Sequence, residues 1–333
     1  EPPLRRLRAA NGSSRDPWSF MFVASGGERR MGAIIERLSE DPTCTLVLAA
    51  IAAGQIASQD AGGSRNDALD DIARVAPDVF GAPGSVPDDA AFTEILQVVQ
   101  AERIVRENRG QFRTAHIRVA DRALLQLARH TDPTIGSTVR ALIRNHLRNP
   151  DLSIRGTYWL LETIARSDSL RYTYRNEWLD DATLSLLVDR ALVVGPGPDR
   201  SIAGRLLATI SRYFNRSQWE RVAAAITAWL PDLTSDEIYG IRWILGYFRR
   251  DETRDLHREI AGSIPATAVA QMFSTRGTRV TARAWSELLN ELSPVHDAED
   301  RPSWSGGFSP GVDIDALGTR LCDVDPWSYP GEV

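Results

Sequence analysis

Residues 135–147 have the sequence IGSTVRALIRNHL, in which the apolar side chains recur with the period of an α-helix. They follow one another at spacings of four, three, one and four residues: Ile135, Val139, Leu142, Ile143 and Leu147. This spacing places all of them on one face of a helix. The stretch therefore predicts an amphipathic helix with a single buried face.

Similar apolar stripes recur along the middle of the chain. Their centres are separated by 19, 26, 19, 20 and 19 residues: Leu142, Leu161, Leu187, Leu206, Ile226 and Leu245. Two helices in about 40 residues is the period of HEAT-like or armadillo-like helical pairs. We therefore expect a mainly α fold with a helical-repeat domain over residues 133–294, although a plain helical bundle would give similar stripes.

The chain before residue 133 is organised differently. Gly- and Pro-containing turns separate four short helical stretches: Trp18–Val23, Met31–Leu38, Leu46–Ile56 and Ala68–Val75. We expect a loop over Pro77–Pro87, then a helix from Asp88 to Ile104, then a turn over Arg106–Gly110. The following segment, Gln111–Ile117, alternates in polarity and is the one convincing strand candidate. Helices, a turn and a strand in this order predict a winged-helix-like module over residues 1–132.

The last segment, residues 295–333, is acidic and rich in Gly, Pro and Ser, with eight acids against two bases. It also carries four aromatic residues: Trp304, Phe308, Trp327 and Tyr329. Aromatic side chains in a loop-like tail favour packing onto a folded domain. We expect the tail to pack back on the body of the protein.

Composition excludes several classes of protein. The 333 residues are 43% hydrophobic and 25% charged, with a net charge of -5, which is typical of a globular chain and gives no global basic excess. No apolar run approaches the about 20 residues of a membrane span, and no secretory leader is visible, so we expect a cytoplasmic protein that does not enter membranes. Cys44 and Cys322 form neither a disulfide framework nor a thiolate metal site.

All 39 basic residues are arginine. A phosphate-binding loop of the Walker type and a Schiff-base site each need a lysine, so this chain supplies neither. Motifs of zinc proteases and serine hydrolases are absent too, and Asp255, His257 and Glu259 lie on different faces of a helix. We therefore expect no catalytic site, no metal site and no cofactor in this chain.

The residues Phe112–His116, followed at once by the helix beginning Arg118-Val119-Ala120, resemble a known family. The segment 46–128 is similar to the winged-helix region after the ATPase core of bacterial STAND-type NTPases, relatives of NLR proteins. In that family a helical-repeat sensor follows, and a histidine near the end of the wing contacts the β-phosphate of ADP. The resemblance implies that role for His116, in the sequence Ala-His-Ile where the family has Met-His-Asp.

On this resemblance the chain is a non-catalytic sensor of a signalling or antiviral defence ATPase. The chain is then either the sensor part of a larger protein, whose ATPase core with ADP or ATP would lie outside this chain and which would oligomerise on activation, or an orphaned relative of that family. An alternative role for His116 is to cap the helix that follows it or to bridge that helix to the strand.

Aromatic residues beside arginines on the predicted helix at 238–248 have the composition of a protein-binding surface. This predicts a partner surface at Arg242, Trp243, Tyr247 and Arg249. The partner is expected to be another protein or the protein's own upstream domains.

A second hypothesis is nucleic-acid binding. Residues 102–148 carry ten arginines and four acids, and a basic wing can contact phosphates. The residues expected to do so are Arg109, Arg113, Arg118 and Arg122. The alternative is that these arginines are ordinary solvated surface residues without a ligand.

Overall fold

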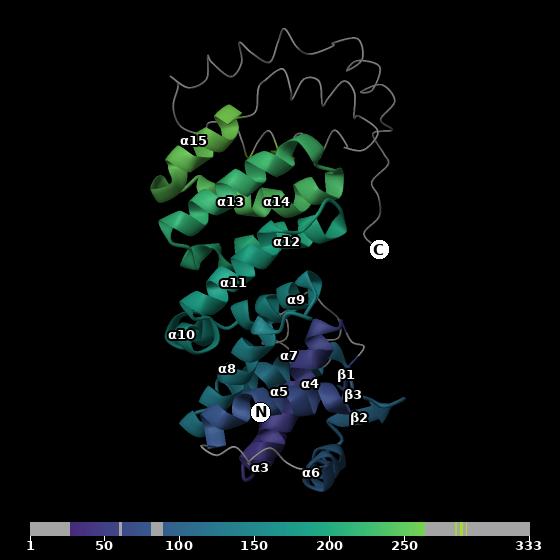
Figure 1. Ribbon diagram of the computed structural model, residues 1–333. Coiled ribbons are helices and arrows are strands. Elements are labelled where there is room, and N and C mark those ends of the chain that lie inside the picture. The colour runs from purple at the N-terminus through teal and green to yellow at the C-terminus, as the bar shows by residue number, and fades with distance from the viewer. Residues whose placement is uncertain are drawn as a thin grey trace, which may run out of the picture. The chain divides into compact units, whose positions relative to one another are not determined.

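The computed structural model describes residues 27–59, 62–80 and 89–263, together with Ala284, Glu287, Leu288 and Glu291. Within this part the protein is mainly helical, as the apolar spacing predicts (Figure 1). The helix predicted at 18–23 and the acidic tail at 295–333 lie outside the described residues. Contacts divide the chain into two compact units, the first ending at Leu184 and the second beginning at Ser185.

Unit 1 contains helices and one small antiparallel sheet (Figure 1). Its elements in chain order are α3 (Gly27–Leu38), α4 (Pro42–Ala57), β1 (Gly63–Ser64), α5 (Arg65–Phe80), α6 (Asp89–Ala101), β2 (Val105–Asn108), β3 (Gln111–Thr114), α7 (Ile117–Ala128), α8 (Pro133–Arg148), α9 (Ile154–Ala165), a π-helical turn (Ser169–Thr173), α10 (Arg175–Trp178) and the first residues of α11 (Asp181–Leu192).

Helix α4 is the centre of unit 1. Its sequence is apolar on every side, and every residue from Cys44 to Ala53 is buried. A helix that is hydrophobic all round belongs in a core, and α4 packs against α5, α6, α7, α8 and α9. Its start is sharp because Pro42 occupies the first turn and the Asp41 carboxylate accepts a hydrogen bond of 2.8 Å from the Thr43 N–H.

The sheet has the strand order β1–β3–β2, with β3 in the middle. Strand β3 is tied to α4 by Gln55, whose Oε1 accepts hydrogen bonds from the backbone N–H and the hydroxyl of Thr114 at 2.7 and 2.9 Å. Gln55 and Thr114 are both buried, so their polar groups must find partners inside the protein. This pairing holds the sheet against the core helix.

Three of the sequence-based boundaries around this sheet are wrong. The predicted turn at 106–110 is mostly strand β2, and only Arg109 and Gly110 form the turn. The predicted strand ends at Thr114, because Ile117 already begins α7. The predicted loop at 77–87 begins too early: α5 runs through Pro77 to Phe80, even though a proline inside a helix removes one backbone hydrogen bond.

The six predicted stripe centres lie in six helices, and all are buried. The single long interval, between Leu161 and Leu187, contains the π-helical turn and α10. Trp178 of α10 is 2% exposed, and its Nε1 donates a 2.8 Å hydrogen bond to the carbonyl of Leu170. An additional short helix is therefore inserted where the regular spacing is interrupted.

Arg140 joins three elements of unit 1. Its side chain is buried; Nη1 donates to the carbonyl of Ala128 at the end of α7, at 2.7 Å, and Nε donates to Glu177 of α10, at 2.6 Å. Helices α7 and α8 also pack on each other directly. The domain boundary predicted at 132–133 thus falls inside unit 1.

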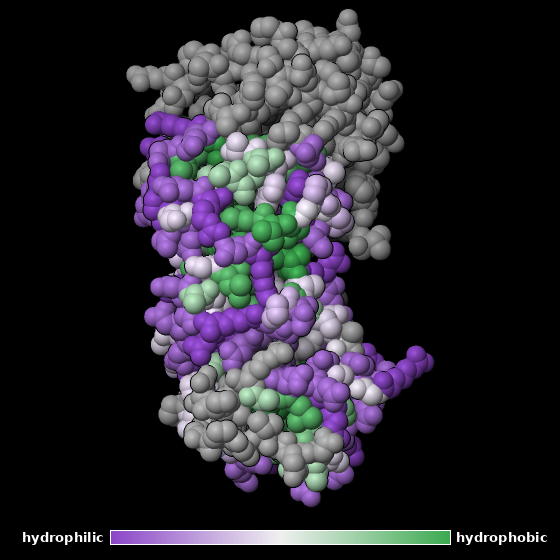
Figure 2. Space-filling model, in the orientation of Figure 1, coloured by the Kyte–Doolittle hydropathy of each residue, from purple (hydrophilic) through white to green (hydrophobic). Residues whose placement is uncertain are grey.

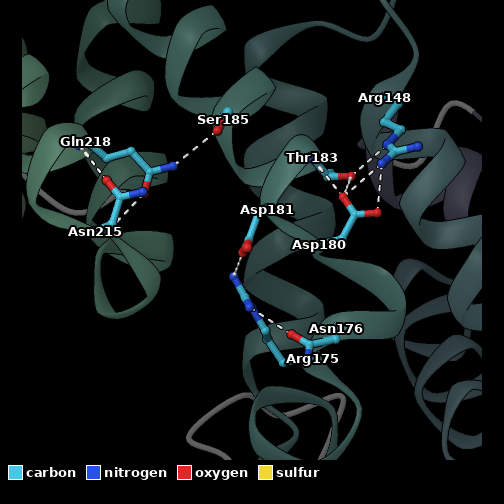
Figure 3. A network of polar contacts seen from close by, with 9 residues as sticks. All are labelled: Arg148, Arg175, Asn176, Asp180, Asp181, Thr183, Ser185, Asn215 and Gln218. Atoms are coloured by element: carbon cyan, nitrogen blue, oxygen red, sulfur yellow. Dashed lines mark hydrogen bonds and ion pairs between the residues drawn. The ribbon is translucent and has the colours of Figure 1, made fainter.

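The start of α11 is organised by Asp180 (Figure 3). One carboxylate oxygen accepts the Thr183 N–H, and Arg148 donates from Nη2 to both oxygens at 2.8 Å. Burial raises the pKa of Asp180, but the hydrogen bonds from Thr183 and Arg148 outweigh burial and leave that pKa below its ordinary value. The charged carboxylate is therefore the form that caps α11.

Unit 2 is helical throughout its described part (Figure 1). It comprises the rest of α11, then α12 (Pro198–Ile210), α13 (Arg216–Trp229), α14 (Ser235–Phe248) and α15 (Arg254–Ser263), with short 3-10 turns at Ser211–Tyr213, Leu230–Asp232 and Asp251–Thr253. Helix α12 packs on α14, and α13 packs on α15. Each of α12 and α13 therefore packs on the helix two places later in the chain.

A capping box begins α13. The Asn215 side chain accepts the Gln218 N–H at 3.0 Å, and the Gln218 side chain accepts the Asn215 N–H at 2.9 Å. The Gln218 amide also donates to Ser185 of α11, at 3.3 Å (Figure 3). Within unit 2, a local cap thus also connects α13 to α11.

Candidate functional site

Helix α14 carries three of the four predicted partner-surface residues, and a capping box fixes where it begins. The Thr234 hydroxyl accepts the Glu237 N–H at 3.4 Å, and the Glu237 carboxylate accepts the Thr234 N–H at 2.6 Å. This start is the one expected from the sequence Thr-Ser-Asp-Glu.

Glu237 has a second role inside unit 2. It is fully buried, and its other oxygen accepts the Gly197 N–H at 2.8 Å and lies 3.5 Å from Nη1 of Arg200. Arg200 is itself 5% exposed and lies over the ring of Trp229. One carboxylate therefore fixes the start of α14 to the start of α12, which sets how the two helices cross.

The crossing of α12 and α14 is made by small residues. A Cβ on Gly204 would lie 2.8 Å from the carbonyl carbon of Gly240, and a Cβ on Gly240 would overlap the backbone of Ser201. The two helix backbones are therefore in direct contact. The buried face of α14 is formed by Ile238, Ile241, Leu245 and Phe248, and the opposite face carries partly exposed side chains.

Three aromatic residues follow one another on that opposite face. Tyr239, Trp243 and Tyr247 are spaced by four residues, which aligns them along one side of the helix. Trp243 is 54% exposed, and the two tyrosines are partly exposed. We call these three residues the aromatic ridge.

Arginines flank the aromatic ridge. The guanidinium of Arg242 lies 5.7 Å from the ring centre of Tyr239 and 5.0 Å from that of Trp243, and Arg250 lies 4.6 Å from that of Tyr247. Such cation–π contacts are typical of surfaces that bind other proteins. Sequence analysis missed Tyr239 and Arg250, although the four-residue spacing from Trp243 was a signal for Tyr239.

Two of the predicted partner-surface residues, Arg242 and Arg249, pair with carboxylates elsewhere in unit 2. Arg242 pairs with Glu287, and Arg249 lies 3.4 Å from the carboxylate of Glu291. Arg249 therefore faces residue 291, whereas Trp243 faces solvent. The surface that the structure brings together is the aromatic ridge with Arg242 and Arg250.

Figure 2 gives the wider setting of these side chains. The described surface is largely hydrophilic, and apolar area gathers in patches, one of which lies where Figure 1 labels α12 and α14.

His116 is the N-cap of α7. Its Nδ1 accepts a 3.1 Å hydrogen bond from the Arg118 N–H, and its backbone is extended, as a capping residue requires. This geometry corresponds to the capping role that the sequence left open.

The four arginines predicted to contact nucleic acid lie on three elements. Arg109 forms the exposed tip of the β2–β3 hairpin, and Arg113 is on β3. Arg118 and Arg122 are on α7, where Arg118 pairs with Asp121 at 3.2 Å. The hairpin and the helix thus hold different members of the set.

Ionisable residues that could support catalysis are engaged in structural contacts. His146 and Asp71 form a buried pair that joins α8 to α5, with 2.9 Å between Nδ1 and Oδ2. Asp255 binds Arg216, and this hydrogen bond lowers the pKa of Asp255 to about 2. Among the described residues no group of His, Cys, Asp and Glu has the arrangement of a metal site.

Comparison of the chain with family models, curated proteins and solved structures found no match. No helix in the described part of the chain is long and apolar enough to span a membrane.

Proposed function

We propose that this protein is a non-catalytic sensor module that recognises a protein partner through the aromatic ridge of its helical array. The observation that carries the proposal is the ridge of Tyr239, Trp243 and Tyr247, with Trp243 54% exposed, on a helix whose opposite face is buried in the array. Large aromatic side chains flanked by arginines are the residues that dominate binding energy at protein interfaces.

The architecture of unit 1 supports a winged helix as the first module. The order α4, β1, α5, α6, β2, β3 and the sheet order β1–β3–β2 are those of a winged helix. Helix α6 then corresponds to the helix that lies before the wing, and the β2–β3 hairpin to the wing.

The packing of unit 2 supports a helical repeat. If consecutive helices are grouped as α12 with α13 and α14 with α15, the like members of the two groups stack on each other, α12 on α14 and α13 on α15. In HEAT-like and armadillo-like arrays successive pairs stack in this way, and their surfaces bind proteins. A winged helix followed by such an array is also the order found in STAND-type sensors, so we propose that the protein acts within a STAND-like signalling or defence system.

The proposed partner is a protein or upstream domains of the same protein, and nucleotide binding by an attached ATPase core and oligomerisation on activation belong to the same proposal. The exposed face of α6 argues against sequence reading of DNA as the main function. It presents Glu94, Gln97 and Val98, and α6 contains no arginine, so it lacks the cations that hold a recognition helix on DNA.

The test compares substitutions of two exposed tryptophans, one in each unit. The full chain, its Trp243→Ala variant and its Trp159→Ala variant are used to capture proteins from the source organism; Trp159 is 37% exposed on α9 and serves as the control. We expect a partner that binds the wild type and Trp159→Ala but not Trp243→Ala. With that partner purified, Trp243→Ala should weaken binding by about 2 kcal/mol, roughly thirtyfold in Kd.

Equal binding by both variants contradicts the proposal, provided that their thermal stabilities match that of the wild type. Turnover of a substrate by the purified chain alone would contradict the non-catalytic assignment.

A further inference from the structure

The β2–β3 hairpin carries a group of arginines that the sensor proposal does not use. Arg103 precedes the hairpin, Arg106 and Arg113 lie on its strands, and Arg109 forms the tip with Gly110. We call these four residues the arginine hairpin.

Register places two of these arginines side by side. Arg106 is directly opposite Arg113, while Val105 and Phe112 belong to the buried face of the hairpin. Like charges directly opposite each other on antiparallel strands destabilise a sheet. The outward face of the hairpin therefore carries two arginines on neighbouring strands.

Most arginines of the described helices form ion pairs, and in this respect Arg103, Arg106 and Arg109 differ from them. Arg37, Arg140, Arg148, Arg216 and Arg221 all pair with carboxylates. Within the part of the chain that the structure describes, the three hairpin residues are exposed and make no ion pair. The acidic Glu107 of the hairpin lies on the opposite face from Arg106.

Backbone conformation adds a second observation. Arg103 and Arg109 have φ of 59° and 55°, in the left-handed region that costs a side-chain-bearing residue about 1 kcal/mol. Two-residue hairpin turns of this type favour Asn-Gly or Asp-Gly, and this chain has Arg109-Gly110. Arginine therefore occupies two strained positions where a smaller residue fits more easily.

We propose that the arginine hairpin binds the phosphate backbone of duplex nucleic acid, independently of base sequence. A two-stranded ribbon fits the major groove, and guanidinium groups bind phosphate oxygens in bidentate fashion. The regular, dense phosphates of a duplex match cations spread along a ribbon, whereas α6 offers no cation to read bases. This surface is separate from the aromatic ridge and adds nucleic acid to the proposed protein partner.

Salt dependence of binding measures the number of phosphates engaged. The full chain is titrated with a short labelled duplex DNA of mixed sequence between about 25 and about 200 mM NaCl. Three to four phosphate contacts predict a slope of log K against log salt of roughly −3. The double variant Arg106→Gln/Arg109→Gln should bind at least about tenfold more weakly at low salt and reduce the slope by about 2.

The matched control is Arg29→Gln/Arg30→Gln, which removes the same charge from two exposed arginines of α3. We expect this control, and the charge-preserving Arg106→Lys/Arg109→Lys, to keep most of the binding. All variants should unfold at the wild-type temperature or slightly above it, because the substituted side chains are exposed and Arg106→Gln removes a like charge opposite Arg113.

Three results would overturn the proposal: no duplex binding at the lowest salt, equal losses in the hairpin variant and the α3 control, or displacement of the duplex by polyglutamate at the same charge concentration. The last result would identify an acidic protein segment as the ligand.

Discussion

His257 on α15 is a buried histidine whose protonation the fold opposes. It is 5% exposed, and its Nε2 donates a 2.7 Å hydrogen bond to the backbone carbonyl of Glu291. Burial lowers the pKa of His257; nearby Arg249 also lowers it, while the hydrogen bond to Glu291 acts in the opposite direction. The folded protein therefore holds the neutral ring.

The pKa direction predicts how stability depends on pH. Since the unfolded chain binds a proton at about pH 6.5 and the folded chain only at lower pH, the unfolded state binds more protons below that value. We expect the His257 contribution to stability to be complete above pH 6.5 and to be lost as the pH falls towards the folded pKa.

Urea unfolding at a series of pH values between about 5 and about 7.5 checks this prediction, with His257→Gln as the comparison. The difference in unfolding free energy between wild type and variant should shrink as the pH falls. A difference that does not change with pH contradicts it, because the other histidines titrate in both proteins.

Single residues also show where sequence reasoning stops. The sequence left two roles open for His116, and the capping bond to the Arg118 N–H belongs to the local one. Gln55 carried no signal at all, yet it is the buried partner of Thr114 on the middle strand. A local contact follows from neighbours in the chain, whereas a contact across 59 residues depends on how the elements pack.

At the level of elements, the α12–α14 crossing depends on glycine. Gly240→Ala places a methyl group against the backbone of Ser201, which cannot move aside as a flexible side chain can. We expect a loss of roughly 1–3 kcal/mol in unfolding free energy from this overpacking, measured by urea denaturation.

Gly246→Ala is the control in the same helix. A Cβ there would lie 3.6 Å from the Glu291 carboxylate, an ordinary contact, at an exposed position. Alanine favours helix over glycine by up to about 1 kcal/mol, so this variant should be as stable as the wild type or more so. Similar destabilisation by both substitutions would show that the close crossing is not what makes Gly240 necessary.

Helices and strands differed in how well they could be predicted. The stripe around Leu142 marks a long helix because its buried face repeats through four turns. Strand β2 has one buried residue, Val105, followed by three exposed ones, so it shows no alternation. Its pairing with β3 depends on the turn at Arg109–Gly110 and on the contact of β3 with α4.

At the level of the whole molecule, the packing of other helices around α4 shields a cysteine in unit 1 from solvent. Cys44 lies in its first turn and is a buried free thiol. Burial, together with the adjacent Asp41 carboxylate, raises the pKa of the Cys44 thiol to about 12. The reactive thiolate is therefore scarce in the folded protein.

We expect Cys44 to resist a thiol reagent at neutral pH until the core of unit 1 opens. Labelling is measured in a Cys322→Ser background, so that a single thiol is followed. The labelling rate should rise together with the loss of helical signal across a urea titration. Rapid labelling in the absence of urea would contradict a closed core around α4.

The boundary between the two units also depends on contacts between residues that are distant in the chain. The predicted boundary at 132–133 lies between α7 and α8, where the sequence changes character. Arg140 connects α8 back to Ala128 and forward to Glu177, and the division between units falls at Leu184. Apolar periodicity contains no information on which neighbouring helices share a core.

The order of residues alone was enough to predict the mainly helical class and the helices with long apolar stripes. These depend on neighbours in the chain and on the choice of one buried face. Tertiary packing determined the rest: the contact of Gln55 with β3, the close glycine crossing of α12 and α14, and the exposure of the hairpin arginines. Each of these requires residues far apart in the chain to meet, and local periodicity cannot encode that.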